Sequence, residues 1–266
     1  MKRQVYFVSD RTGITIEALG HSLLSQFKDL KFEFTTLRYV DSLNKIENLC
    51  QTIDGYEGEE RPLIFSTLVD GQLRAKLGRV NAHVFDLMGE FLTPLEEILN
   101  TQASLALGHT HGPGSDKHYA HRMDAVNYAL LNDDGLTTRH LDRADIILIG
   151  PSRSGKTPTC LYLAMQYGVY AANYPLVEED FELMRLPGVL AKRRDQLFGL
   201  SITAERLQQI REVRRPDSEY ASIKQCQYEV NQIGILYREN RISTCDVTQR
   251  SVEEIATRIL PHLHLL

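Results

Sequence analysis

The feature that most constrains this chain is an apolar run that leads directly into a glycine-containing loop. The run ADIILIG (144–150) has the composition of a strand buried on both faces. From Gly150 to Thr157 the sequence keeps the spacing G-x-x-x-x-G-K-[ST], and the residues that follow have helical periodicity. A strand, this loop and a helix in that order form a phosphate-binding unit. The segment therefore predicts a parallel α/β sheet with a nucleotide site at one strand end.

The residue types in this loop suit a nucleotide diphosphate. Successive backbone N–H groups form an anion-binding concavity, and the helix that follows adds partial positive charge. Lys156 supplies an ammonium and Thr157 a hydroxyl for Mg²⁺, so we expect both to be catalytic and Thr157 to be the metal ligand. The expected nucleotide-binding residues are Gly150, Pro151, Ser152, Arg153, Ser154, Gly155, Lys156 and Thr157. The alternative is an ordinary strand-to-helix turn.

A second carboxylate for the metal ion is not obvious in the sequence. Asp246, which follows RISTC, is one candidate, and Asp86 and Asp70 are others. Each of the three also fits a turn or a helix cap. Asp10, in the SDRTGIT segment, lies at another predicted strand-to-helix junction, where it is either part of an anion site or a simple N-cap.

The chain before the loop alternates strand and helix patterns. Apolar alternation predicts strands at 4–10, 32–40, 61–69 and 82–88, with helical periodicity at 13–27, 42–53 and 71–80. This order indicates parallel sheets covered by helices. We therefore predict an α/β protein, with an N-terminal parallel-sheet domain over 1–140 and a P-loop kinase-like nucleotide-binding domain over 141–266.

A histidine-rich polar segment interrupts this rhythm. His109, His111, His118 and His121 fall within or just after a predicted loop over 106–120, and their spacing is not that of a zinc motif. Histidine transfers protons near neutral pH, so we expect one of them, with His118 as the candidate, to face the substrate.

Charge and composition exclude several classes of function. The net charge of −5 disfavours broad nucleic-acid binding, and no apolar run is long enough to cross a membrane. Four scattered cysteines and the absence of a leader-like N-terminus favour the cytoplasm. Residues 185–215 nevertheless carry eight basic and three acidic side chains. This basic segment is either a solvated helix face or an anion-binding surface that includes Arg211, Arg214 and Arg215.

Several blocks of the sequence together resemble a known family. The blocks are VYFVSDRTGITIEALGHSLLSQF, YAHRMDAVNYALLNDDG, ADIILIGPSRSGKTPTCLYLAMQYG, GLSITAERLQQIREVRR, YAS and DVTQRSVEEIA. They are similar to the phosphoenolpyruvate synthase regulatory protein family, also called the bifunctional kinase–pyrophosphorylase family, which includes pyruvate,phosphate dikinase regulatory proteins. The resemblance extends from about residue 4 to 257. Many members lack the second loop glycine, whereas this chain has Gly155.

The resemblance implies an ADP-dependent serine/threonine kinase that inactivates its target by phosphorylating a threonine beside the catalytic histidine. It also implies reversal by inorganic phosphate, with release of pyrophosphate. The loop from Gly150 to Thr157 would bind ADP, with Mg²⁺ as the expected metal. The expected partner is phosphoenolpyruvate synthase or pyruvate,phosphate dikinase, and a homodimer would suit a dimeric target.

Two rival functions remain open at this stage. One is a P-loop kinase that acts on a small molecule, although such kinases usually carry the loop near the N-terminus. The other is a nucleotide-sensing protein without turnover. For the proposed protein kinase, Arg211, Arg214, Arg215, His118 and Asp246 are the candidates for contacts with the target or a second anion.

Overall fold

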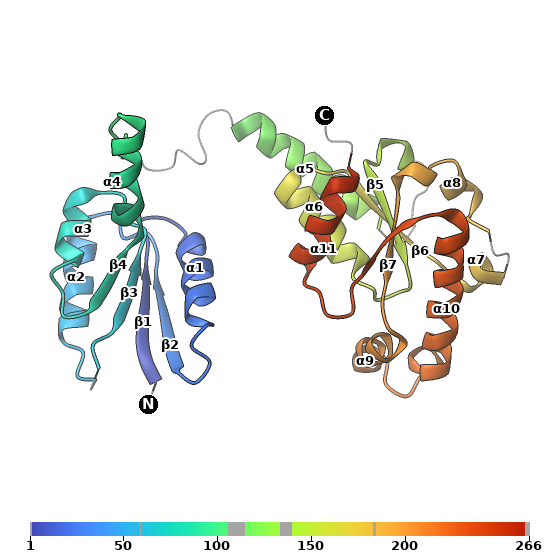
Figure 1. The fold of residues 1–266 in the computed structure, drawn as a ribbon, viewed down its shortest axis with the longest axis horizontal. Coiled ribbons are helices and arrows are strands. Elements are labelled where there is room, and N and C mark those ends of the chain that lie inside the picture. Colours follow the sequence, from blue (N-terminus) through green and yellow to red (C-terminus); the bar gives the residue numbers. More distant parts are fainter. Residues whose placement is uncertain (1, 59, 106–114, 134–139, 183–184, 264–266) are drawn as a thin grey trace. The chain divides into compact units, whose positions relative to one another are not determined.

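The computed structural model describes residues 2–58, 60–105, 115–133, 140–182 and 185–263. It divides the chain into two compact units, residues 1–110 and 111–266 (Figure 1). Each unit contains a four-stranded sheet in which every strand pair is parallel. The α/β class that the sequence predicts is therefore confirmed.

The first unit has the strand order β2-β1-β3-β4. Its elements are β1 (Lys2–Val8), α1 (Ile14–Leu24), β2 (Lys31–Leu37), α2 (Leu43–Asp54), β3 (Leu63–Ser66), α3 (Gly71–Leu77), β4 (His83–Asp86) and α4 (Leu87–Leu99). Figure 1 shows α1 on one face of this sheet and α2 with α3 on the other. Sequence patterns predicted the strands and the first three helices but not α4.

Alternate residues of β1 supply the two apolar layers of the first unit, because successive side chains of a strand point to opposite faces. Val5 and Phe7 pack with Ile16 of α1, whereas Tyr6 and Val8 belong to the cluster on the α2 side. The central strand is thus buried on both faces, as a parallel sheet covered by helices requires.

The second unit has the strand order β6-β5-β7-β8. Its strands are β5 (Ile146–Gly150), β6 (Ala171–Pro175), β7 (Leu197–Ser201) and β8 (Ser243–Asp246). Its α-helices are α5 (Ser115–Leu131), α6 (Lys156–Tyr167), α7 (Glu178–Glu182), α8 (Gly188–Ala191), α9 (Ala204–Arg214), α10 (Ile223–Asn240) and α11 (Val252–Ile259). Short 3-10 turns lie at Leu141–Arg143, Arg194–Gln196, Glu219–Ala221 and Leu260–His262.

Strand β5 is the centre of the second unit and is buried along its whole length. Ile146 and Leu148 pack in the cluster that includes residues of α5, α6 and α11, while Ile147 and Ile149 pack on the opposite face against α10. Burial on both faces explains why this strand is a continuous apolar run in the sequence. At the far end of the chain, Ser251 and Glu254 form the predicted capping box of α11.

Helix α5 belongs to the second unit, so the structure divides the chain earlier than the predicted boundary at residue 140. Ala125 and Ala129 of this helix are buried in the same cluster as Leu163 and Ala164 of α6. These small side chains let the two helices approach closely. The contact places the end of α5 beside the glycine-containing loop.

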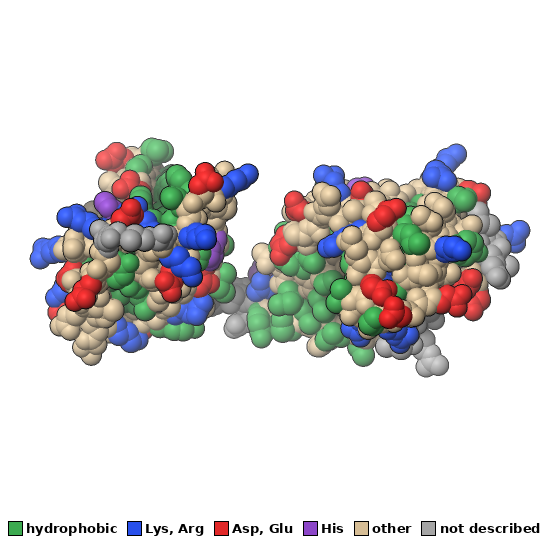
Figure 2. Space-filling view, turned by 90° about the horizontal axis from the view of Figure 1, so that it is seen from below, with side chains coloured by type: hydrophobic (Ala, Val, Ile, Leu, Met, Phe, Trp, Pro, Cys, Tyr) green, Lys and Arg blue, Asp and Glu red, His purple; other side chains and the backbone are tan. Residues whose placement is uncertain are grey.

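The face of each unit that Figure 2 shows does not carry one dominant charge. On the faces shown in Figure 2, basic and acidic side chains are interspersed on each unit. Of the helices in the described ranges, none combines the length and apolar character that a bilayer-spanning helix requires.

Candidate active site

The predicted phosphate loop joins the end of β5 to the start of α6. Gly155 is the N-cap residue of α6 with φ 86°, and Arg153 also has a positive φ, of 75°. The left-handed region is costly for a residue with a Cβ, and such strain is concentrated at functional sites. The hydroxyl of Thr159 donates to Gly155 O over 2.8 Å, which fixes the first turn of the helix. The backbone of this loop is therefore tightly constrained.

Gly150 is required by close packing beneath the loop. A Cβ at this position would lie 2.8 Å from Leu200 O and 3.2 Å from the hydroxyl of Tyr237. That hydroxyl donates to Ile149 O on β5 and to Leu200 O on β7, which pins the two strands together. The glycine thus allows the loop to turn directly above this buried contact.

Lys156 is buried, with 4% of its surface exposed, and its ammonium lies within the loop. Its Nζ donates to Gly150 O over 3.0 Å and to Pro151 O over 2.9 Å. A buried ammonium is costly unless it is hydrogen-bonded, and main-chain carbonyls supply those bonds here. The positive charge is thereby held at the N-terminus of α6, where helix geometry already favours an anion.

The loop borders a small open hollow of about 230 Å³. Its lining residues are Ser152, Arg153, Gly155, Lys156, Thr157, Pro158 and Asn173. Six of them come from the loop and the start of α6, and Asn173 comes from the neighbouring strand β6. Five of the eight expected nucleotide-binding residues, Ser152, Arg153, Gly155, Lys156 and Thr157, therefore line one concavity.

A carboxylate that the sequence analysis did not identify lies beside Thr157. Asp133, two residues beyond the last residue of α5, accepts hydrogen bonds through Oδ1 from Thr157 Oγ1 at 2.8 Å and from Asn173 Nδ2 at 2.6 Å. Asn173 Nδ2 is also 3.0 Å from Thr157 Oγ1. Three elements therefore converge on this cluster of oxygen and amide groups. The only sequence signal was an acidic pair, NDDG, at the end of a predicted helix.

Residues of α9, of α10 and of the turn between them hold Ser152 in position. Arg211 Nη2 donates to Ser152 O over 3.2 Å, and the hydroxyl of Tyr220 donates to Ser152 Oγ over 2.9 Å. The guanidinium also stacks 4.0 Å from the centre of the Tyr220 ring. Both Arg211 Nη atoms bond the carboxylate of Glu229, at 2.9 and 2.6 Å. This buried network fixes the position of the loop.

The expectation that Arg211 contacts a partner or a second anion at the surface needs correction. Its exposed fraction is 0%, and its charge is paired with Glu229. The guanidinium lies inward because Glu229 and the carbonyls of Ser152 and Tyr220 satisfy its donors there. Arg214 and Arg215, at the end of the same helix, are exposed and remain available for such a contact.

The other predicted candidates are separated from the loop cluster or already have structural roles. Asp246 accepts from both the backbone N and the hydroxyl of Thr248, and these hydrogen bonds hold the pKa of its carboxyl below the usual value. Asp70 and Asp86 cap helices α3 and α4 of the first unit. Within the described part of the chain, the side chain of Thr157 contacts Asp133 and Asn173 instead of any of these carboxylates.

The described histidines and Asp10 lie in different surroundings. His118 is exposed on α5, and His121 packs against the ring of Tyr170 with centroids 5.3 Å apart. His109 and His111 lie outside the described residues. Asp10 is buried and accepts from Val69 N over 3.0 Å, so it ties the loop after β1 to the loop after β3.

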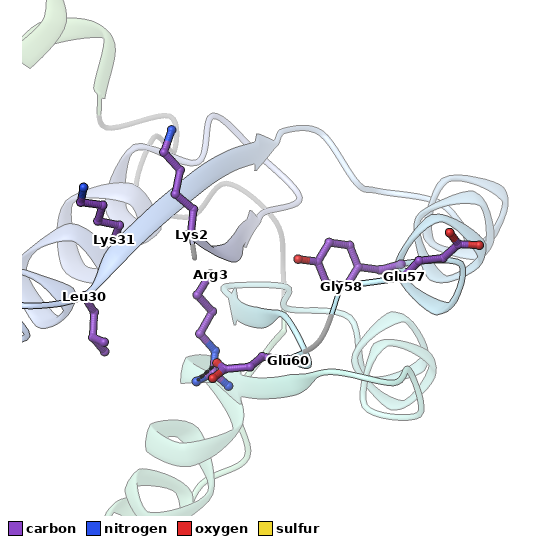
Figure 3. A pocket seen from close by; sticks show the side chains of 8 residues that line it. Lys2, Arg3, Leu30, Lys31, Glu57, Gly58 and Glu60 are labelled. Atoms are coloured by element: carbon purple, nitrogen blue, oxygen red, sulfur yellow. Dashed lines mark ion pairs between the residues drawn. The ribbon is translucent and has the colours of Figure 1, made fainter.

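A larger hollow, of about 660 Å³, lies in the first unit (Figure 3). It is lined by Lys2, Arg3, Leu30, Lys31, Tyr56, Glu57, Gly58 and Glu60. The close-up shows Arg3 and Glu60 directed toward each other, and their ion pair is 3.0 Å long. The hollow surrounds the starts of β1 and β2, whereas parallel sheets bind ligands at the ends of their strands. Its larger volume therefore does not make it a stronger candidate for the nucleotide site than the hollow at the phosphate loop.

Comparison with known proteins gives a consistent result over nearly the whole chain. Residues 5–260 match the family described as Kinase/pyrophosphorylase. A Marinobacter nauticus protein named "Putative phosphoenolpyruvate synthase regulatory protein" is 48% identical over 266 residues, covering 98% of this chain and 97% of that relative. Proteins with the same name from Legionella pneumophila (strain Lens) and Hahella chejuensis are 48% and 49% identical over 262 residues. Each alignment covers 98% of this chain, and 97% and 96% of the respective relative.

Proposed function

The chain belongs to the kinase/pyrophosphorylase family, and from this premise we propose that it is a bifunctional regulator of phosphoenolpyruvate synthase. In the forward direction, a threonine hydroxyl of the target attacks the β-phosphorus of ADP, the bond to the bridging oxygen breaks, and AMP leaves. In the reverse direction, inorganic phosphate attacks the phosphothreonine, and pyrophosphate leaves as the threonine is regenerated. The protein would thus inactivate and reactivate its target.

One observation carries this proposal: the ammonium of Lys156 is buried among the carbonyls of a constrained loop at the N-terminus of α6. Phosphoryl transfer needs positioning and charge neutralisation more than covalent chemistry. In this proposal the loop amides and Lys156 bind the diphosphate of ADP. The exposed Arg153 lines the same hollow and would bind the transferring group or, in reverse, inorganic phosphate.

We also propose that the site binds a divalent cation, because its side chains include oxygen ligands that suit such an ion. The Thr157 hydroxyl lies at the hollow beside the carboxylate of Asp133, and oxygen ligands of this kind suit Mg²⁺. When bound, the ion would neutralise charge on the phosphate oxygens. In this proposal Thr157 is the loop residue that would hold the ion.

The most direct functional test uses phosphoenolpyruvate synthase and ADP labelled at the β-phosphate. We expect label on a threonine of the synthase. When the labelled synthase is then incubated with inorganic phosphate, we expect the label to appear in pyrophosphate. Label transferred only to small molecules would instead indicate a small-molecule kinase. Nucleotide binding with no transfer of label would indicate a nucleotide-sensing protein.

A further inference from the structure

We infer that Asp133 is the carboxylate of the cation site, and that it acts with Thr157 to hold Mg²⁺ against the nucleotide diphosphate. The inference rests on the proposed function and deepens it, because it assigns a metal ligand from the segment just after α5, which precedes the phosphate loop in the chain. The observation that leads to it is the 2.8 Å contact between Asp133 Oδ1 and Thr157 Oγ1.

Electrostatic repulsion favours a cation beside Asp133. Asp133 places a carboxylate beside Thr157, at the edge of a hollow whose other features favour an anion. A diphosphate and a carboxylate so close together repel each other unless a cation lies between them. A negative side chain at an anion site is therefore explained if the ligand arrives as its Mg²⁺ complex.

The oxygen donors of Asp133 and Thr157 suit Mg²⁺. Mg²⁺ is held in proteins by one or two carboxylates together with substrate phosphates and water, and it does not need a cage of protein ligands. Neighbouring oxygens in an octahedral Mg²⁺ shell lie about 2.9 Å apart, since each is about 2.05 Å from the ion. The observed 2.8 Å between the two oxygens is close to this value.

Asn173 orients the oxygens of Asp133 and Thr157. Asn173 on β6 donates to Asp133 Oδ1 over 2.6 Å, and the same Nδ2 is 3.0 Å from Thr157 Oγ1. An amide that contacts both oxygens fixes their separation and direction, which is the usual role of groups behind metal ligands. The site is thus built from α6, from β6 and from the segment that directly follows α5, and these three elements are anchored in the core of the second unit.

The test compares ADP binding by the full chain and by Asp133→Asn, measured by calorimetry in EDTA and then over a Mg²⁺ titration. For the wild type we expect Mg²⁺ to tighten ADP binding. For the variant we expect the apparent Mg²⁺ affinity to fall about 10–100-fold. In EDTA the variant should bind ADP at least as tightly as the wild type, because the repelling charge is gone. A merely structural role for Asp133 would weaken ADP binding equally in both conditions.

Two further measurements protect this test against a folding defect. In Thr157→Val, as in Asp133→Asn, we expect Mg²⁺ to tighten ADP binding much less than in the wild type. Thr157→Ser, which keeps the hydroxyl, should retain the wild-type response to Mg²⁺. Mn²⁺ bound in the presence of ADP can be counted by electron paramagnetic resonance, and the signal of bound Mn²⁺ should weaken in Asp133→Asn. Asp195→Asn is the matched control, since Asp195 is an exposed carboxylate beside the start of β7, the opposite end of the sheet.

The outcomes separate this inference from the proposed function. If Asp133→Asn keeps the wild-type Mg²⁺ dependence, or loses ADP affinity equally with and without Mg²⁺, the inference is overturned while the proposed function stands. If the wild type binds ADP equally well with and without Mg²⁺, the inference is likewise overturned. If the wild type binds no ADP under any condition, the proposed function fails and the inference fails with it.

Discussion

The carbonyl oxygen of Ser152 in the phosphate loop accepts a 3.2 Å hydrogen bond from the guanidinium of Arg211, although the two residues are 59 positions apart. The guanidinium is buried and is held in turn by the carboxylate of Glu229. The loop therefore does not depend only on its own glycines for its shape. Contacts from helices α9 and α10 also hold the loop in position.

We predict that Arg211→Met destabilises the second unit by about 3–5 kcal/mol, because the carboxylate of Glu229 is then left without its buried partner. The double variant Arg211→Met, Glu229→Gln should recover part of this loss. Urea denaturation measures both. Arg214→Met, an exposed neighbour on the same helix, serves as the control and should change the free energy of unfolding by less than about 0.5 kcal/mol. An equally small effect at Arg211 would show that the network does not support the loop.

We predict that Gly150→Ala destabilises the fold by about 1–3 kcal/mol, since the added methyl group would lie 2.8 Å from Leu200 O in a packed interior. Gly188→Ala is the matched control, because a Cβ at Gly188 meets no atom within 4 Å. Thermal unfolding of the two variants gives the comparison. Equal melting temperatures would mean that the strand end can shift to accept a side chain.

The four cysteines should be unreactive in the native protein. Cys50, Cys160, Cys226 and Cys245 are all buried, and burial raises the pKa of each thiol. Raised pKa values leave less thiolate at mildly alkaline pH, and the thiolate is the reactive form. We expect Ellman's reagent to titrate four thiols in denaturant and to react only slowly before unfolding. Rapid reaction of any one thiol in the native state would contradict the packing described above.

Arg214 and Arg215 should affect transfer to the protein target without affecting nucleotide binding. Both side chains are exposed at the end of α9, the helix whose Arg211 contacts the phosphate loop. We predict that the double change to Glu lowers the rate of label transfer to phosphoenolpyruvate synthase and leaves the Kd for ADP unchanged. Reversal of Lys192 and Arg206, two other exposed cations of the basic segment, controls for net charge. Unchanged transfer by the Arg214, Arg215 variant would remove these residues from the docking surface.

Lys156→Ala should weaken ADP binding about 10–100-fold, the value expected for losing hydrogen bonds to a charged group. We expect the fold to persist. Lys192→Ala, at an exposed lysine of the same unit, is the control. Calorimetric titration with ADP measures the effect, and equal affinity in the two variants would rule out Lys156 as a phosphate ligand.

The sequence predicted the parts of the fold that local patterns encode. Strand β5 could be predicted because both of its faces are buried, and the loop could be predicted because its glycines and lysine occur at a fixed spacing. Helix α4 was not predicted. Phe91, Leu95 and Ile98 follow helical spacing, but Pro94 interrupts the pattern, and proline is unfavourable inside a helix.

The features that the sequence did not predict depend on contacts between distant residues. Asp133 and Thr157 are 24 positions apart, and nothing in the pattern of α5 indicates that its end reaches the loop. Arg211 looked like part of a surface patch because neighbouring residues are basic. Its burial depends on Glu229, one helix later, and a charge count cannot reveal that pairing.

The central claim is that the turn from Gly150 to Thr157 binds the diphosphate of ADP. A crystal structure of the chain with ADP and Mg²⁺ tests this claim most directly. We predict that the diphosphate lies within hydrogen-bonding distance of the loop amides and of Lys156 Nζ. ADP bound elsewhere, with that turn free of phosphate, would contradict the account.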